Sequence, residues 1–106
     1  MPTISTLSGR SIFDYTGNCT EGFFLEYAGH PFITPQIINS ILDHFQGTTV
    51  RGGFNMNNPT GFGRWVLENT PFSSKHASHI AAVLDHENLI SHSFDGSRII
   101  LHFEQR

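Results

Sequence analysis

The hydrophobic period of this chain changes twice along its length. Towards both ends, apolar residues alternate with polar ones, which is the pattern of half-buried strands. Between these ends, apolar residues recur three and four positions apart, as they do on one face of a helix. The order of strands, helices and strands within 106 residues predicts one small α+β domain with a single core.

The N-terminal strand pattern predicts a β-hairpin or a small meander. Two short aromatic runs, residues 11–15 and 22–27, flank residues 16–18, which are Thr, Gly and Asn and are typical of turns. Within the second run, alternation places Phe24 on the face opposite to Phe23. We therefore expect the ring of Phe24 to be partly exposed.

Three helices are predicted in the middle of the chain. The first begins at Pro35 after a Thr34 cap and ends before Gly47, which can adopt a left-handed conformation. The second runs from about residues 60–62 to residue 69, and the third from about residue 74 to residue 86. The inward stripe of the third helix is Ala77, Ile80, Ala81 and Leu84, and its predicted outward face is Lys75, Ser78, Ala82 and Asp85.

Between the first two helices, residues 48–63 are rich in glycine and asparagine and are not predicted to form a regular helix. This segment includes Arg51-Gly52-Gly53-Phe54 and ends in Gly61-Phe62-Gly63, followed by Arg64. Arginine, glycine and aromatic residues together can bind single strands through charge and stacking. The simpler interpretation, which we favour, is that the glycines permit sharp turns while the two phenylalanines attach the loop to the core.

The chain ends in a second predicted hairpin, with Asp95-Gly96 as its two-residue turn. This turn pairs Phe94 with Ser97, His92 with Ile99 and Ile90 with Leu101. The apolar face of that hairpin is then Ile90, Phe94, Ile99, Leu101 and Phe103.

The order of helix, turn, helix and hairpin resembles a winged helix-turn-helix domain. The likeness covers about the last 30 residues: the helix at 78–84, a terminating Asn88, the pair Leu89-Ile90, and the hairpin that ends in 99–101. In that family the helix after the turn lies in the major groove of DNA, and the hairpin, or wing, contacts the backbone or minor groove. The resemblance implies contacts from the third helix by Lys75, His76, Ser78, His79 and Ala82, and from the wing by Ser97 and Arg98. Arg51 and Arg64, which flank the glycine-rich segment, complete the candidate nucleic-acid contacts.

Composition limits the possible functions. Only 14% of the residues are charged, and six Lys and Arg against nine Asp and Glu leave a formal net charge of −3. This balance argues against tight, nonspecific binding to phosphate backbones. The single cysteine, Cys19, excludes an intramolecular disulfide, and the chain has neither a phosphate-binding glycine motif nor a Gly-x-Ser-x-Gly elbow. No apolar run is long enough to cross a bilayer and no signal peptide is evident, so we expect a cytoplasmic protein.

Seven histidines raise the question of a metal site. His76 and His79 are three residues apart and could share a helix face, but no His-Glu-x-x-His pattern or third ligand accompanies them. We therefore expect no metal or other cofactor. Protonation of all seven histidines would change the formal charge from −3 to about +4, so pH-sensitive association is a further hypothesis.

We predict a noncatalytic binding module, with nucleic acid in a regulatory setting as the leading partner. The alternative is a protein-interaction or assembly module, and an enzyme or histidine metal site ranks third. The domain would comprise an N-terminal hairpin region, 1–32, and a winged-helix-like region, 33–106. The candidate protein contacts are Phe24, Phe54, Phe62 and Trp65.

Overall fold

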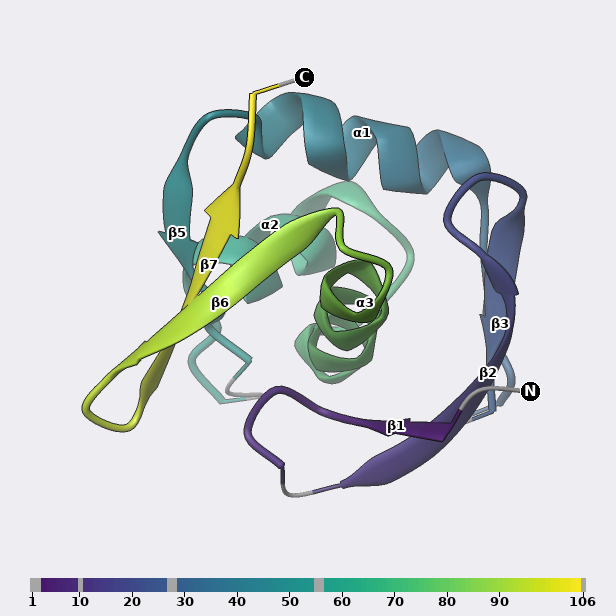
Figure 1. Cartoon of the computed structure of the whole chain (residues 1–106), viewed down its shortest axis with the longest axis horizontal. Helices are drawn as coiled ribbons and strands as arrows, with labels where there is room; N and C mark the ends of the chain where they lie inside the picture. Colours follow the sequence, from purple (N-terminus) through teal and green to yellow (C-terminus); the bar gives the residue numbers. More distant parts are fainter. Residues whose placement is uncertain (1–2, 10, 27–28, 55–56, 106) are drawn as a thin grey trace.

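Two antiparallel sheets and two helices surround a central helix, α3 (Ser74–His86), in the computed structural model (Figure 1). The structure describes residues 3–9, 11–26, 29–54 and 57–105. One hydrophobic core joins residues from both sheets and all three helices of these segments. The predicted α+β class and single small domain are therefore confirmed. No helix in the described part of the chain has the length and apolar character needed to cross a bilayer.

The N-terminal region is a four-stranded meander, which extends the predicted hairpin by one short strand on each side. Its strands, in spatial order, are β1 (Thr3–Ser5), β2 (Ile12–Asn18), β3 (Gly22–Leu25) and β4 (Phe32–Ile33). The outer strands β1 and β4 have only three and two residues, too few for alternation to reveal them. The boundary expected after residue 32 falls inside β4.

The first turn lies later in the chain than predicted. Residues 16–18 belong to β2, where they pair with Phe24, Phe23 and Gly22, so placing the turn there was wrong. The chain turns at residues 19–21 instead, because the side-chain oxygen of Asn18 accepts hydrogen bonds from the amides of Thr20 (2.9 Å) and Glu21 (2.8 Å).

The predicted face of Phe24 is confirmed. Phe23 and Leu25 are fully buried, whereas Phe24 is 46% exposed. Residues 27–28, which end the second predicted run, lie outside the described residues.

Helix α1 (Pro35–Phe45) follows the predicted start and stop signals. The Thr34 hydroxyl accepts a hydrogen bond from the amide of Ile37 at 3.2 Å, and Pro35 occupies the first turn. Gly47 adopts a positive φ of 70° just after the helix. The helix buries Ile38, Ile41, Leu42 and Phe45.

The glycine-rich segment contains a strand that the sequence did not reveal, β5 (Thr49–Arg51). It pairs with β7 (Arg98–Phe103), and β7 pairs with β6 (Ile90–Asp95), giving the order β5-β7-β6. After β5, the amide of Gly52 donates to the carbonyl of Ile99 at 2.9 Å, which extends this pairing by one residue.

Helix α2 (Gly61–Asn69) packs its first turn directly on the backbone of the loop that precedes it. The amide of Gly63 donates to the carbonyl oxygen of Gly52 at 2.7 Å, and a Cβ on Gly63 would lie 2.2 Å from the carbonyl oxygen of Gly53. The ring of Phe54 contacts that of Phe62 edge-on, with centroids 6.3 Å apart. The glycines thus allow close backbone approach, and the contact between Phe54 and Phe62 attaches the loop to the core. Residues 55–56 of the loop lie outside the described part.

Helix α3 has the predicted bounds, but its predicted outward face is partly buried. Ser73 caps it, and His76 completes a capping box. Ala82 and His79, which the winged-helix resemblance placed at a DNA groove, are only 2% and 3% exposed, so their expected exposure was wrong. The N-terminal sheet covers this side of the helix, as Phe13 of β2 shows by lying edge-on to His79 with ring centroids 4.6 Å apart.

The C-terminal hairpin has the predicted faces but a shifted register. Ile90 pairs with Phe103 and His92 with Leu101, so the predicted pairing was wrong by two residues. The turn is Gly96-Ser97, with Gly96 at a φ of 64°, because glycine suits the first position of a type II′ turn. A shift of two residues leaves every side chain on its predicted face, since the side-chain period of a strand is two.

Candidate functional site

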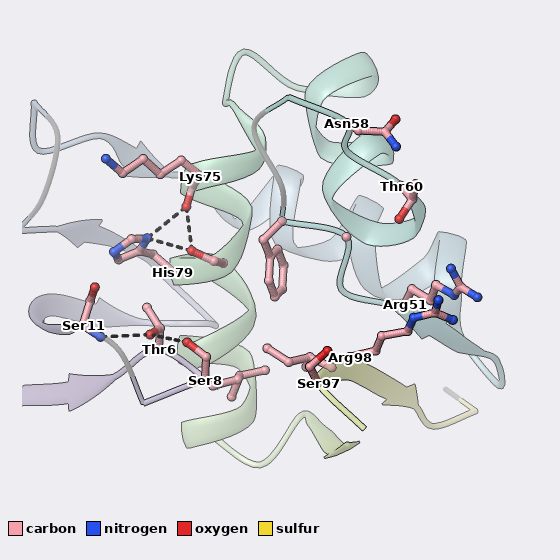
Figure 2. Close-up of a pocket in the computed structure, with 15 residues that line it drawn as sticks. Thr6, Ser8, Ser11, Arg51, Asn58, Thr60, Lys75, His79, Ser97 and Arg98 are labelled. Carbon is pink, nitrogen blue, oxygen red and sulfur yellow. Dashed lines mark hydrogen bonds between the residues drawn. The ribbon is translucent and has the colours of Figure 1, made fainter. Parts of the chain in front are cut away.

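A cavity of about 820 Å³ opens beside the N-terminal half of α3 (Figure 2). Four segments that are distant in sequence line it: the β1–β2 connection, the end of β5 with its following loop, α3, and the start of β7. The cavity therefore exists only because the N-terminal sheet and the C-terminal sheet lie on either side of α3.

Three basic side chains line the cavity, and no acidic residue is among its described lining residues. They are Arg51 from β5, Lys75 from α3 and Arg98 from β7. The chain as a whole is acidic, with a formal net charge of −3. A concave site lined by one sign of charge focuses the field and attracts ligands of the opposite sign.

The two arginines reach the same end of the cavity. Arg51 pairs with Ile100 across β5 and β7, so Arg98, two residues along β7, shares the same sheet face as its diagonal neighbour. Figure 2 shows these two side chains at one end and Lys75 at the opposite end. Neither arginine forms an ion pair with any residue that the structure describes. Asp95 faces Arg98 across the hairpin but does not line the cavity.

The remaining lining is mostly neutral and rich in hydroxyl groups. In the β1–β2 connection, the Thr6 hydroxyl lies 3.4 Å from that of Ser8 and accepts a hydrogen bond of 3.4 Å from the amide of Ser11. On α3 the Ser78 hydroxyl donates to the carbonyl of Lys75 at 2.8 Å. The other polar lining residues are Asn58, Thr60 and Ser97, and the apolar ones are Leu7, Phe54 and Ile99.

His79 contributes a neutral imidazole to this wall. Burial lowers its pKa from the ordinary value of 6.5, and the neighbouring His76 and Lys75 lower it further, against the effect of its backbone hydrogen bond. Its Nδ1 lies 3.0 Å from the carbonyl oxygen of Lys75, which can only accept, so Nδ1 carries the proton. His79 therefore adds no positive charge to the cavity at neutral pH.

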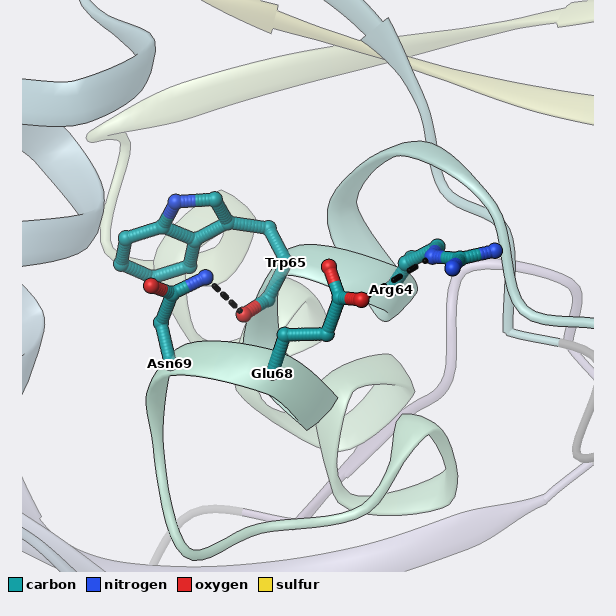
Figure 3. Close-up of polar contacts among 4 residues, drawn as sticks. All are labelled: Arg64, Trp65, Glu68 and Asn69. Atoms are coloured by element: carbon teal, nitrogen blue, oxygen red, sulfur yellow. Dashed lines mark hydrogen bonds and ion pairs between the residues drawn. The ribbon is translucent and has the colours of Figure 1, made fainter.

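The structure gathers six of the nine candidate nucleic-acid contacts in this cavity, and places the other three elsewhere. The six are Arg51, Lys75, Ser78, His79, Ser97 and Arg98. Ala82 is buried. His76 serves the cap of α3, with its Nδ1 3.0 Å from the Ser73 hydroxyl. Arg64 lies on α2 and forms an ion pair of 3.3 Å with Glu68 (Figure 3).

The four candidate protein contacts have four different environments. Phe62 is fully buried, so its assignment as a surface contact was wrong, and Phe54 lines the cavity. Trp65 is partly buried and stacks on His44 with centroids 4.9 Å apart, while its carbonyl accepts a hydrogen bond from the Asn69 side chain at 2.9 Å (Figure 3). Phe24 remains exposed, beside Phe32 at 4.6 Å.

Nucleophilic chemistry at Cys19 has no support. Burial, together with the nearby Glu87, raises the pKa of this thiol to about 12, so it stays protonated at neutral pH. The described residues contain no group of three His, Cys, Asp or Glu side chains placed to hold a metal ion.

No local pattern in the sequence indicates the hydroxyl-bearing wall formed by the β1–β2 connection. Thr6 and Ser8 are about 70 residues from Lys75 in the chain, and no motif links them. No family model, curated protein or solved structure gives a significant match to this chain.

Proposed function

We propose that this protein is a noncatalytic module that binds nucleic acid through the cavity beside α3. The main observation behind the proposal is that basic side chains cluster in this cavity. Three of the four basic side chains in the described part of an acidic chain line one cavity, and no described lining residue is acidic.

The chemistry of the lining suits a phosphate backbone. Arg51 and Arg98 can each donate two parallel hydrogen bonds to phosphate oxygens, and Lys75 supplies a point charge. Serine and threonine hydroxyls, which are abundant in this wall, commonly bind phosphate and sugar oxygens in nucleic-acid interfaces. Positive groups at both ends of the cavity favour a ligand that carries more than one phosphate.

The mode of binding differs from the one that the winged-helix resemblance implies. Because Ala82 and His79 are buried, α3 cannot lie along the major groove of DNA. Only its first turns can contact nucleic acid. Of the residues implied by the resemblance, the proposal retains Lys75, Ser78 and Arg98. Arg51 joins them from the glycine-rich segment.

Salt-dependent binding tests the proposal. Three phosphate contacts should weaken the binding of a short oligonucleotide roughly 20- to 40-fold between about 50 mM and 200 mM salt. Fluorescence anisotropy with labelled oligonucleotides measures this slope. Replacing Arg98 with alanine should lower the slope by roughly 0.7–0.9 and weaken binding.

Arg64→Ala is the matched control, because it removes the same charge from an exposed position outside the cavity. It should change affinity far less than Arg98→Ala does. A flat salt dependence, or equal effects of the two variants, would contradict the proposal.

A protein-interaction role is the second candidate, favoured by one observation. Phe24 and Phe32 form an exposed aromatic pair on the outer face of the N-terminal sheet, on the opposite face from the buried Phe23 and Leu25. Concentration-dependent light scattering tests for self-association. Loss of a dimer in Phe24→Ser, with oligonucleotide binding retained, would assign the two functions to separate surfaces.

A further inference from the structure

We infer that the cavity takes a single strand rather than a duplex, with a base stacked on Phe54 and backbone phosphates at the arginine and lysine ends. This inference rests on the proposed function and specifies the form of nucleic acid that the site selects.

Neither α3 nor the β6–β7 hairpin suits the major groove. An element that reads a groove needs an exposed face. On α3 the middle turns are buried, with Ala82 at 2% exposure. The β6–β7 hairpin extends from the body of the molecule (Figure 1), but Asp95 at its turn would face the phosphates that flank a groove.

The shape of the site also favours a single strand. The basic side chains line a concave space of about 820 Å³, which is within the size range of sites for small organic ligands. A duplex is stiff and keeps its base faces stacked inside, whereas a single strand can bend into a cavity and present a free base face. Figure 2 shows that the cations lie at separate ends of this space, as successive phosphates of one strand would require.

Phe54 is held in place by its surroundings. A Cβ on Gly52 would lie 2.7 Å from the Phe54 ring, so the ring packs directly against the backbone of Gly52. The edge-on contact with Phe62 supports it from the core side, and part of the ring remains accessible and lines the cavity. A preoriented aromatic ring is the usual platform for stacking a base, whatever its identity.

Competition between strand forms tests the inference. Anisotropy at one low salt concentration compares a labelled DNA single strand with its duplex. We expect the single strand to bind at least about tenfold more tightly. Phe54→Leu should weaken single-strand binding by roughly 5- to 100-fold, because one stacked base is lost, and Phe54→Tyr should restore it. The salt slope should stay unchanged in Phe54→Leu, because all three cations remain.

Phe94→Leu is the matched control, since Phe94 is an exposed ring outside the cavity. If the duplex binds as tightly as the single strand, or if Phe54→Leu behaves like Phe94→Leu, the inference is overturned while salt-dependent binding still supports the proposed function. If neither form binds, both the inference and the proposed function fail.

Discussion

Individual polar side chains join the N-terminal sheet to α3. Glu87, at the end of that helix, accepts hydrogen bonds from the hydroxyl of Tyr15 at 2.8 Å and from the amide of Cys19 at 2.9 Å. Burial and the same carboxylate raise the pKa of Tyr15, so its phenol remains a neutral donor at physiological pH. On the same helix, the ring of His79 lies edge-on to that of Phe13. Each of these contacts links residues more than 60 positions apart, beyond the reach of any local sequence pattern.

The lowered pKa of His79 predicts acid sensitivity. Below its ordinary pKa of about 6.5, the unfolded chain gains a proton at this site that the folded chain resists, so the free energy of unfolding should fall as pH decreases from about 7 to 5. The contribution of His79 to this fall in the free energy of unfolding ends once the pH lies below the pKa of His79 in the folded protein. Urea unfolding at a series of pH values measures the trend.

His79→Leu should remove part of that pH dependence. His86→Leu, on the same helix but at an exposed position, is the control for the general effect of losing a histidine. Identical pH slopes in the parent protein and His79→Leu would show that burial of His79 does not contribute.

Among the elements, α2 and the loop after β5 depend on direct backbone contact. The first turn of α2 lies against Gly52 and Gly53, and β5 adds a third strand to the C-terminal hairpin. The sequence indicated irregular structure here because glycine weakens every local preference. The strand became stable only through pairing with β7, about 50 residues away.

Gly63→Ala should destabilise the protein even though alanine is the better helix former. Helix propensity alone favours alanine by roughly 1 kcal/mol, but the new Cβ would lie 2.2 Å from a backbone oxygen of Gly53. We expect a net loss of about 1–3 kcal/mol in the free energy of unfolding, as in other overpacked sites. Urea unfolding followed by circular dichroism measures it.

Ser40→Ala, on the exposed face of α1, is the control and should change stability by less than about 0.5 kcal/mol. A stabilising or neutral Gly63→Ala would mean that the loop can move away from α2 at little cost.

In the whole molecule, the two sheets share one core across α3. Phe23 of the N-terminal sheet and Leu101 of the C-terminal sheet belong to the same cluster of buried residues, and both are fully buried. A region such as 1–32 is therefore a segment of the sequence rather than an independent unit. Removing the N-terminal sheet would expose the apolar side of α3 that it covers.

The shared core predicts a single cooperative unfolding transition. Trp65 fluorescence reports on the helices, and the reactivity of the buried Cys19 thiol reports on the N-terminal sheet. Their midpoints in urea should coincide. Phe23→Leu should lower both midpoints by the same amount. If Cys19 reacted at urea concentrations where Trp65 is still native, the N-terminal sheet would be opening on its own.

Local rules explain what the sequence by itself determined: the three helices, the Thr34 cap of α1, and the inward faces of the predicted strands. Capping and hydrophobic period depend on neighbours within about four residues, so the chain encodes them wherever it folds. The sequence determined the register of the C-terminal hairpin less well. Alternation of apolar residues determines which face each side chain occupies, but registers that differ by two residues have the same faces, and only the turn distinguishes them.

Only the tertiary structure decided which surfaces are open. The sequence predicted that the face of α3 with Lys75 and Ala82 points outward. In the structure Ala82 and His79 are buried, and Phe13 of the N-terminal sheet lies against His79. The same arrangement brings Arg51, Lys75 and Arg98 to one cavity from three elements. The exposure of a side chain and the clustering of basic groups depend on which elements pack against each other. That packing is determined by the total apolar area buried in one core, to which residues throughout the chain contribute.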